Sequence, residues 1–185
     1  MLVFATPDHI APKQLLTRVG KHAQMVIVLI GVTGAGKTCV GTALAEKLGW
    51  VFLDADALHG EANLNKLHDG IQLDDADRWP WLDRVRTIIA AHVAQQQPVI
   101  IACSALKNIY RRHLRISPEV VFVYLNADER VLEERLKRRR GHFMNPSLLK
   151  SQLETFEETQ DDILAVDASR SPVDIVQLIR TTLHV

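Results

Sequence analysis

The chain has 185 residues, 47% of them hydrophobic, and this length and composition predict one globular domain with a buried core, not a disordered chain. Lysine plus arginine and aspartate plus glutamate both number 22, which excludes a general electrostatic attraction to nucleic acid or to an anionic membrane. The longest apolar run, MVIVLIGV, is far shorter than the roughly 20 residues of a membrane-spanning helix. We therefore expect a soluble protein whose anion-binding site is local.

The first 24 residues carry no chemistry that the sequence identifies. They lack the basic start, apolar core and small-residue cleavage site of a secretory signal, so we expect no export and a cytoplasmic location. This N-terminal extension (1–24) is a disordered tail, a short docking helix or sequence upstream of a start at Met25, and these alternatives stay open. The two cysteines, Cys39 and Cys103, agree with a reducing compartment, and we expect both to be small buried thiols.

Residues 25–185 alternate short β-branched runs with longer stretches of helical spacing. The short runs are continuously apolar, which is typical of strands buried on both faces of a parallel sheet with helices covering each face. The pattern predicts a three-layer α/β fold with a five-stranded parallel sheet in a single domain. The expected strands are 25–30, 51–55, 98–103, 120–125 and 162–167, and the expected helices are 37–48, 61–68, 79–95, 107–114, 128–139, 147–158 and 172–183.

The stretch GVTGAGKT joins the first expected strand to the first expected helix. Gly31, Gly36, Lys37 and Thr38 have the spacing of a phosphate-binding loop in the strand–loop–helix context that such a loop needs. Glycines let backbone N–H groups converge on phosphate oxygens at a helix N-terminus, while the lysine bridges the β and γ phosphates and the threonine hydroxyl holds Mg²⁺. The sequence therefore predicts a nucleotide-binding site.

Two carboxylates follow the second expected strand, in LDADALH. Asp54 and Asp56 are two residues apart, so on an extended chain both face the phosphate loop at the carboxyl edge of the sheet. One carboxylate could orient metal-bound water while the other accepts the proton of a hydroxyl nucleophile. The alternative is a helix N-cap followed by a solvated turn, and the spacing alone does not decide between them.

Cations cluster in two later segments. In IACSALKNIYRR, Lys107 and Arg111 are four apart and share a helix face, which suits an anionic acceptor or an ordinary solvated basic face. The basic block between Arg135 and Arg140 leads into GHFMNP. It is either a solvated helix end or part of a mobile lid, at about 138–150, that brings an arginine to a phosphoryl group in transfer.

The segment DRWPWL predicts a helix start, with Pro80 in the first turn and Trp79 and Trp81 packed in the core. Arg78 follows the acidic run DDAD, so its alternatives are a local ion pair and a place in the acceptor site. No spacing in the sequence resembles a zinc site.

Together these segments resemble the gluconokinase family of small P-loop kinases, related in architecture to shikimate and adenylate kinases. The motifs stand in the family's order and cover about residues 25–183. The resemblance implies a P-loop kinase fold and transfer of the ATP γ-phosphoryl group to the 6-hydroxyl of D-gluconate, with Mg²⁺ as the metal and a homodimer as the assembly. The segments are GVTGAGKT, DADALH, GIQLDDADRWPWL, ACSALKNIYR, RLKRRRGHFM and LLKSQLETFE.

The resemblance also implies roles for individual side chains. Asp56 would position or deprotonate the reacting hydroxyl, Asp54 would act on Mg²⁺ through water, and the loop after Asp167 would flank adenine. The implied catalytic residues are Lys37, Asp56, Arg135 and Arg139; the implied nucleotide-binding residues are Gly31, Thr33, Gly34, Ala35, Gly36, Lys37, Thr38, Arg135 and Asp167; the implied gluconate-binding residues are Asp56, His59, Arg78, Lys107, Arg111, His142 and Gln152; and the implied metal residues are Thr38 and Asp54.

Two other functions use the same phosphate loop. A nucleotide-dependent switch would carry an Asn-Lys-x-Asp guanine reader and an Asp-x-x-Gly segment after a strand, and we find neither in the sequence. A kinase for another small polyhydroxy acid would use the same cations and hydroxyl-reading side chains. That alternative stays open.

Overall fold

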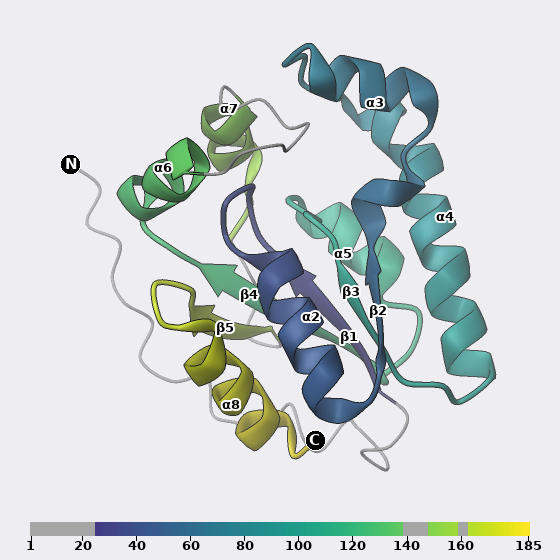
Figure 1. Ribbon diagram of the computed structural model, residues 1–185. Helices are drawn as coiled ribbons and strands as arrows, with labels where there is room; N and C mark the ends of the chain where they lie inside the picture. The colour runs from purple at the N-terminus through teal and green to yellow at the C-terminus, as the bar shows by residue number, and fades with distance from the viewer. Residues whose placement is uncertain (1–24, 139–147, 159–162) are drawn as a thin grey trace.

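The computed structural model describes residues 25–138, 148–158 and 163–185, and these form a three-layer α/β domain (Figure 1). Its sheet has five parallel strands in the order β2-β3-β1-β4-β5. The predicted sheet is therefore confirmed, with strand ends shifted by one or two residues. The strands are β1 (Val26–Ile30), β2 (Val51–Asp54), β3 (Val99–Ala102), β4 (Val120–Asn126) and β5 (Leu164–Asp167).

Seven α-helices are described, together with a short 3₁₀ helix, η2 (Ala55–Leu58), that directly follows β2. None of the described helices is both long and apolar enough to cross a membrane. The N-terminal extension and residues 139–147 of the expected lid lie outside the described part of the chain. The helices are α2 (Lys37–Leu48), α3 (Glu61–His68), α4 (Asp75–Ala94), α5 (Asn108–Leu114), α6 (Glu129–Arg138), α7 (Leu148–Thr155) and α8 (Pro172–Leu183).

Helix α4 begins earlier than the sequence predicts, and the acidic run before Arg78 is the reason. Asp74 is the N-cap and accepts a hydrogen bond from the backbone N–H of Asp77 at 2.8 Å. The Asp77 carboxylate in turn accepts the N–H of Asp74 at 3.1 Å, which completes a capping box. Pro80 therefore lies inside the helix and not in its first turn, so that part of the prediction is wrong.

Each face of the sheet carries its own apolar core. Alternate residues around β1 point to opposite faces, so Ile27 and Leu29 join one cluster while Val26 and Val28 join the other. Helices α2 and α8 cover the first face, and α4 and α5 cover the second (Figure 1). This two-sided burial explains the continuously apolar strands.

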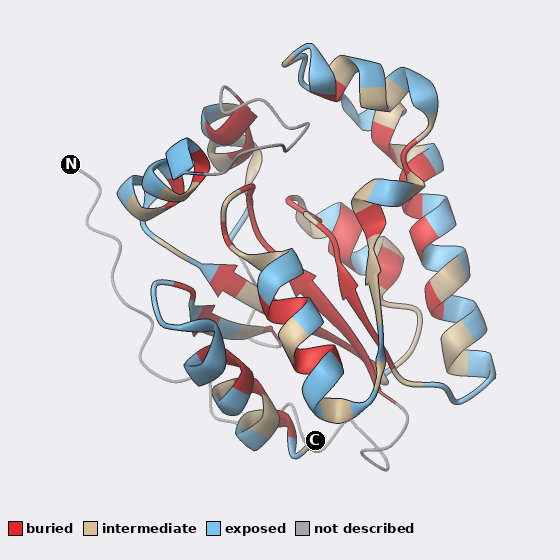
Figure 2. Ribbon diagram, viewed as in Figure 1, coloured by how far each residue is buried: buried red, intermediate tan, exposed pale blue. Residues whose placement is uncertain are grey.

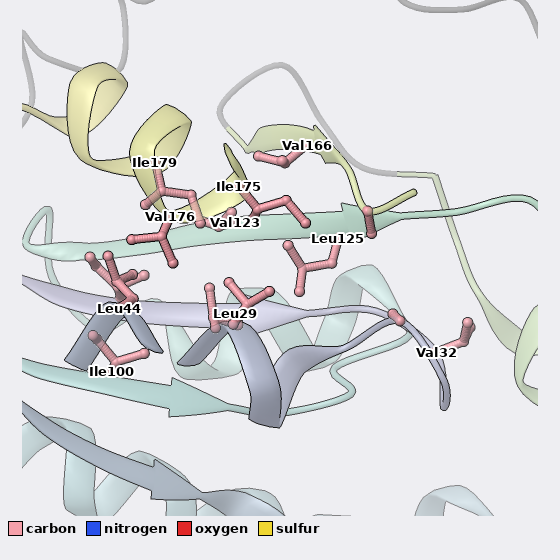
Figure 3. Close-up of a cluster of buried hydrophobic side chains, with 14 of the residues drawn as sticks. Leu29, Val32, Leu44, Ile100, Val123, Leu125, Val166, Ile175, Val176 and Ile179 are labelled. Atoms are coloured by element: carbon pink, nitrogen blue, oxygen red, sulfur yellow. The ribbon is translucent and has the colours of Figure 1, made fainter. Parts of the chain in front are cut away.

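The layering is visible in the burial pattern, because the three inner strands β3, β1 and β4 are mostly buried while each covering helix exposes its outer surface (Figure 2). In the first cluster, Leu44 of α2 and Ile175 and Ile179 of α8 converge on β1 and β4 (Figure 3). Gly41 of α2 allows a close approach of this helix to β2, since a Cβ there would lie 2.3 Å from the ring of Phe52. The core thus fixes α2, and with it the loop that precedes α2.

The sheet order places that loop at the centre of the carboxyl edge. The chain leaves the central strand β1, returns to the sheet at β2 and β3 on one side of it, and then passes to β4 and β5 on the other. In open parallel sheets, ligands bind at the carboxyl edge where the strand order reverses direction. Segments after β2 and β3 therefore flank the β1–α2 loop on one side, and the segment after β5 flanks it on the other.

Candidate active site

The loop from Gly31 to Gly36 has the backbone of a phosphate cradle. Gly31 has a φ of 140° and approaches β4 so closely that a Cβ would lie 2.9 Å from the carbonyl oxygen of Leu125. Gly36 has a φ of 95° and is the N-cap of α2. Such positive φ values are readily adopted only by glycine. The N–H groups at the start of α2 consequently face the end of the loop, where an anion is stabilised.

Two polar side chains at the start of α2 are positioned for phosphate and metal chemistry. The Nζ of Lys37 donates to the carbonyl oxygens of Gly31 at 2.9 Å and Val32 at 3.0 Å, which folds the lysine back over the loop. The hydroxyl of Thr38 donates to a carboxylate oxygen of Asp54 at 2.9 Å. The loop motif and the carboxylate at the end of β2 are therefore brought together as the sequence predicts.

The loop forms the wall of a cavity of about 350 Å³. One side is lined by groups that follow β2 and β3, and the other by groups from α6, from the loop after β5 and from α8, as the sheet order requires. The lining residues are Thr33, Gly34, Ala35, Gly36, Lys37, Thr38, Cys39, Val40, Asp54, Asp56, Ser104, Arg135, Leu136, Gln152, Ala168, Arg170, Pro172 and Ile175.

Asp54 and Asp56 both line this cavity, although the backbone between them is not extended. Asp54 caps η2 by accepting the N–H of Asp56 at 3.1 Å, so the N-cap alternative and the functional interpretation describe the same residue. The buried indole of Trp81 donates to the carbonyl oxygen of Ala55 at 2.7 Å. Trp81 therefore packs in the core as predicted and also holds the turn that carries Asp56.

On the opposite side of the loop, Arg135 bridges two backbone segments. Its guanidinium donates to the carbonyl oxygen of Ala168 at 2.6 Å and to that of Ala35 at 3.5 Å. Asp167 does not line the cavity; its carboxylate accepts the N–H and hydroxyl of Ser169 at 2.9 and 2.6 Å, and these bonds lower its pKa. The loop after β5 thus reaches the cavity through Ala168 and Arg170.

Gln152 reaches the phosphate loop from α7. Its side-chain oxygen accepts the backbone N–H of Thr33 at 2.7 Å, and the side chain is only 7% exposed. The resemblance implies a contact with gluconate for this residue. The structure places it against the loop, in the lining of the same cavity.

His59 is the C-cap residue of η2 and is buried. Its ring stacks on Trp81, with ring centroids 4.4 Å apart and an interplanar angle of 15°. Burial, followed by the charges of Arg78 and Arg84, lowers the pKa of His59 to about 4. The ring is therefore neutral at physiological pH. Arg78 is 7% exposed, and its Nε donates to the carbonyl oxygen of Leu73 at 3.2 Å. Neither side chain is part of the cavity lining given above.

Lys107 and Arg111 do not share a solvated face. Lys107 is the N-cap of α5, and its Nζ lies 2.6 Å from a carboxylate oxygen of Asp75, which also accepts the Tyr110 hydroxyl. Arg111 is 3% exposed, so the solvated-face alternative is wrong for it. Neither cation lines the cavity.

The guanidinium of Arg111 instead joins the start of α5 to the segment that follows α7. It donates to the carbonyl oxygens of Ala105 at 2.8 Å and Leu106 at 2.9 Å, and to those of Glu157 at 2.7 Å and Glu158 at 3.2 Å. Ala105 has a φ of 38°, a conformation that a side chain disfavours. Arg111 therefore supports a strained turn directly after Ser104, which lines the cavity.

The cysteines differ from each other. Cys103 is fully buried as predicted, and burial raises the pKa of its thiol to about 12. Cys39 is exposed and lines the cavity, so the expectation of a buried thiol is wrong there. Its position in the first turn of α2, on the side facing away from the core, explains the difference.

The sequence does not identify every residue that lines the cavity, and two predicted site residues lie outside the described part of the chain. Arg170, Pro172 and Ile175 line the cavity, and the only sequence signal for them is their position just after the last strand. Arg139 and His142 lie in the undescribed segment 139–147. Their roles stay predictions.

The donor set suits Mg²⁺ bound together with a nucleotide. Within the described ranges no group of three or more His, Cys, Asp or Glu side chains could hold a metal alone. Mg²⁺ is bound by one or two carboxylates together with substrate phosphates and waters, and the Thr38–Asp54 pair beside the phosphate loop provides such oxygens.

A phosphate cradle at the centre of a parallel sheet, with carboxylates on one side, defines the chain as a P-loop kinase. The family model described as "AAA domain" matches residues 26–159. The gluconokinase of Gluconobacter oxydans (strain 621H) is 42% identical over 168 residues, which cover 89% of this chain and 94% of the relative. The thermoresistant gluconokinase of Escherichia coli (strain K12) is 41% identical over 150 residues, covering 79% and 86%. The chain belongs to the gluconokinase family.

Solved structures agree with this assignment. A gluconokinase from Sinorhizobium meliloti 1021 superposes with a TM-score of 0.78 at 41% identity, covering 89% of this chain and 94% of that one. A shikimate kinase from Bacteroides thetaiotaomicron has a TM-score of 0.63 at 20% identity, covering 87% and 99%. The second likeness shows the shared fold alone, and it confirms the predicted relation in architecture to shikimate kinases.

Proposed function

We propose that this protein transfers the γ-phosphoryl group of ATP to the 6-hydroxyl of D-gluconate, giving 6-phospho-D-gluconate and ADP. One observation carries the proposal: a single cavity joins the phosphate loop to the Asp56 carboxylate. Relatives named gluconokinases, about 40% identical over most of the chain, support gluconate as the acceptor.

The nucleotide occupies the phosphate loop and the side of the cavity after β5. Backbone N–H groups at the start of α2 bind the phosphates, and Lys37 exchanges its two loop carbonyls for the β and γ phosphates. Arg135 already links the loop to Ala168, so it lies between the phosphates and the segment that flanks the base.

The acceptor occupies the side after β2 and β3. The Asp56 carboxylate accepts or orients the proton of the attacking hydroxyl, while Lys37 stabilises the charge of the phosphoryl group in transfer. Thr38 and, through water, Asp54 would hold Mg²⁺, which would supply neutralisation of the phosphate charge. Phosphoryl transfer depends on positioning and charge stabilisation, and both requirements are met by groups on rigid elements.

We also propose which cations bind the carboxylate of gluconate, how the protein assembles and where it is located. Lys107 and Arg78 are the cations that the family resemblance implies for the acid group, and His142 and the lid Arg139 complete the proposed set. A homodimer and a cytoplasmic location are further proposals, based on the family resemblance and on the sequence composition.

The test is ADP release from Mg-ATP, measured without acceptor and with D-gluconate, shikimate, other sugar acids or nucleoside monophosphates. We expect a rise with gluconate that Lys37→Ala reduces by orders of magnitude while the far-UV circular dichroism stays unchanged. An equal or larger rise with a different sugar acid would support the polyhydroxy-acid alternative. Release that no acceptor changes would overturn the kinase proposal.

A further inference from the structure

The side chain of Gln152 forms a contact between α7 and the phosphate loop that crosses 119 positions of sequence. Its oxygen accepts the Thr33 N–H at 2.7 Å, and the side chain is more than nine-tenths buried. Thr33 itself is 6% exposed. A buried N–H without a hydrogen-bond partner destabilises the folded state, so this contact favours the observed position of the first half of the phosphate loop.

The chemistry of the contact fixes the orientation of the amide. A backbone N–H is only a donor, so the atom of Gln152 that faces Thr33 has to be the oxygen. The amide is planar, and its NH₂ group therefore points away from Thr33 with two donor hydrogens. Gln152 lines the cavity that also contains Lys37 and Asp56, where phosphoryl transfer is proposed to occur.

We propose that Gln152 acts through both ends of its amide: the oxygen holds the phosphate loop at Thr33, and the NH₂ group donates to the phosphoryl group in transfer. This inference rests on the proposed function, and it assigns Gln152 to the phosphoryl group, not to the hydroxyls of gluconate.

A neutral amide is the side chain that suits both contacts. Glutamate can accept the Thr33 N–H but has no donor and would add negative charge beside the phosphates. Methionine has a similar length and provides neither contact. The two substitutions therefore separate the roles, because Gln152→Glu keeps the loop contact alone and Gln152→Met removes both. Lys150→Met, at an exposed position of the same helix, is the matched control.

The first measurement is hydrogen exchange at the Thr33 amide, which needs no acceptor. We expect wild-type protection in Gln152→Glu and Lys150→Met, and faster exchange in Gln152→Met. Equal protection in all four proteins would overturn the loop contact. Thermal unfolding of the same samples checks that Gln152→Met remains folded.

The second measurement is kcat and KM for both substrates, together with the slow ATP hydrolysis that occurs without acceptor. Removing a donor used only in the transition state lowers kcat by about 10²- to 10³-fold, so we expect this loss in Gln152→Met with the gluconate KM nearly unchanged. The KM for ATP should rise in Gln152→Met, because this variant also loses the contact that holds the phosphate loop. Gln152→Glu should lose at least as much turnover despite its protected amide. ATP hydrolysis should fall in both variants, since it uses the same phosphoryl group.

Other results would overturn the assignment. A rise in gluconate KM at unchanged kcat would show that Gln152 reads the acceptor, and wild-type turnover in Gln152→Glu would show that no donor is needed. If the wild-type protein shows no gluconate-dependent ADP release, the proposed function fails. The acceptor-independent hydrolysis and the Thr33 exchange then still decide the role of Gln152.

Discussion

Replacing Arg111 with methionine should destabilise the protein and leave the sheet intact. Arg111 is 3% exposed, and its guanidinium donates to the carbonyl oxygens of Ala105 and Leu106, both of which belong to fully buried residues. Methionine keeps the bulk of the side chain and removes every one of these donors. The turn after β3 would lose its support at Ala105, whose φ of 38° is already unfavourable.

The size of the effect follows from the contacts. An unsatisfied buried acceptor costs about 1–3 kcal/mol, and Leu106 keeps a second hydrogen bond, at 2.9 Å from the N–H of Glu157. The Ala105 carbonyl therefore dominates, with smaller contributions from Glu157 and Glu158, which are exposed. Burial lowers the pKa of Arg111, and removing a buried charge recovers part of the cost. The net loss should be about 1–3 kcal/mol.

Urea unfolding followed by tryptophan fluorescence measures this difference in the free energy of unfolding. Arg111→Lys should recover little, because an ammonium group cannot reach several carbonyls in the geometry of the guanidinium. Arg112→Met, on the exposed side of the same helix, should change stability by less than about 0.5 kcal/mol. A stable Arg111→Met protein whose gluconate KM rises more than tenfold would refute this reasoning and return Arg111 to the acceptor site.

Three further predictions concern the metal, pH and packing. Asp54→Asn should raise the Mg²⁺ concentration for half-maximal ADP release by about 10- to 100-fold, and an unchanged Mg²⁺ dependence would remove Asp54 from the metal site. Burial lowers the pKa of His59 to about 4, so as pH falls the unfolded chain binds a proton before the folded protein does. The free energy of unfolding of the wild type should therefore drop between about pH 6.5 and 4 relative to that of His59→Phe, by about 1.4 kcal/mol per pH unit. A pH-independent difference between the two proteins would contradict this. Gly41→Ala should destabilise by about 1–2 kcal/mol in thermal or urea unfolding, because the clash with Phe52 exceeds the gain in helix propensity; a more stable variant would show that the ring moves freely.

The sheet and the phosphate loop could be predicted because their signals are local. Five apolar runs, each bounded by helical spacing, give the strands, and the glycine spacing before Lys37 gives the cradle. The start of α4 was missed because acidic residues are as common in loops as in capping boxes. Only the reciprocal bonds of Asp74 and Asp77 distinguish the two cases.

The contacts between distant segments could not be predicted in the same way. The bond from Thr33 to Gln152 and the bond from Trp81 to Ala55 join elements whose relative placement is fixed only when both cores form. A lone glutamine in LLKSQ and a tryptophan in DRWPWL carry no sign of these partners. Hydrophobic packing determines where the helices lie, and polar contacts form between the groups that this packing brings together.

A residue's place in a motif therefore does not separate a substrate-binding side chain from one that supports the segment on which a binding group lies. Asp56 lines the cavity, but its turn is held by the indole of Trp81, and Ser104 lines the cavity beside the turn held by Arg111. Loss of either support would move a lining group and raise an acceptor KM without any lost contact to the acceptor. A KM change alone thus cannot assign a role. A binding residue should change the KM at constant stability, whereas a supporting residue should change the KM and the free energy of unfolding together.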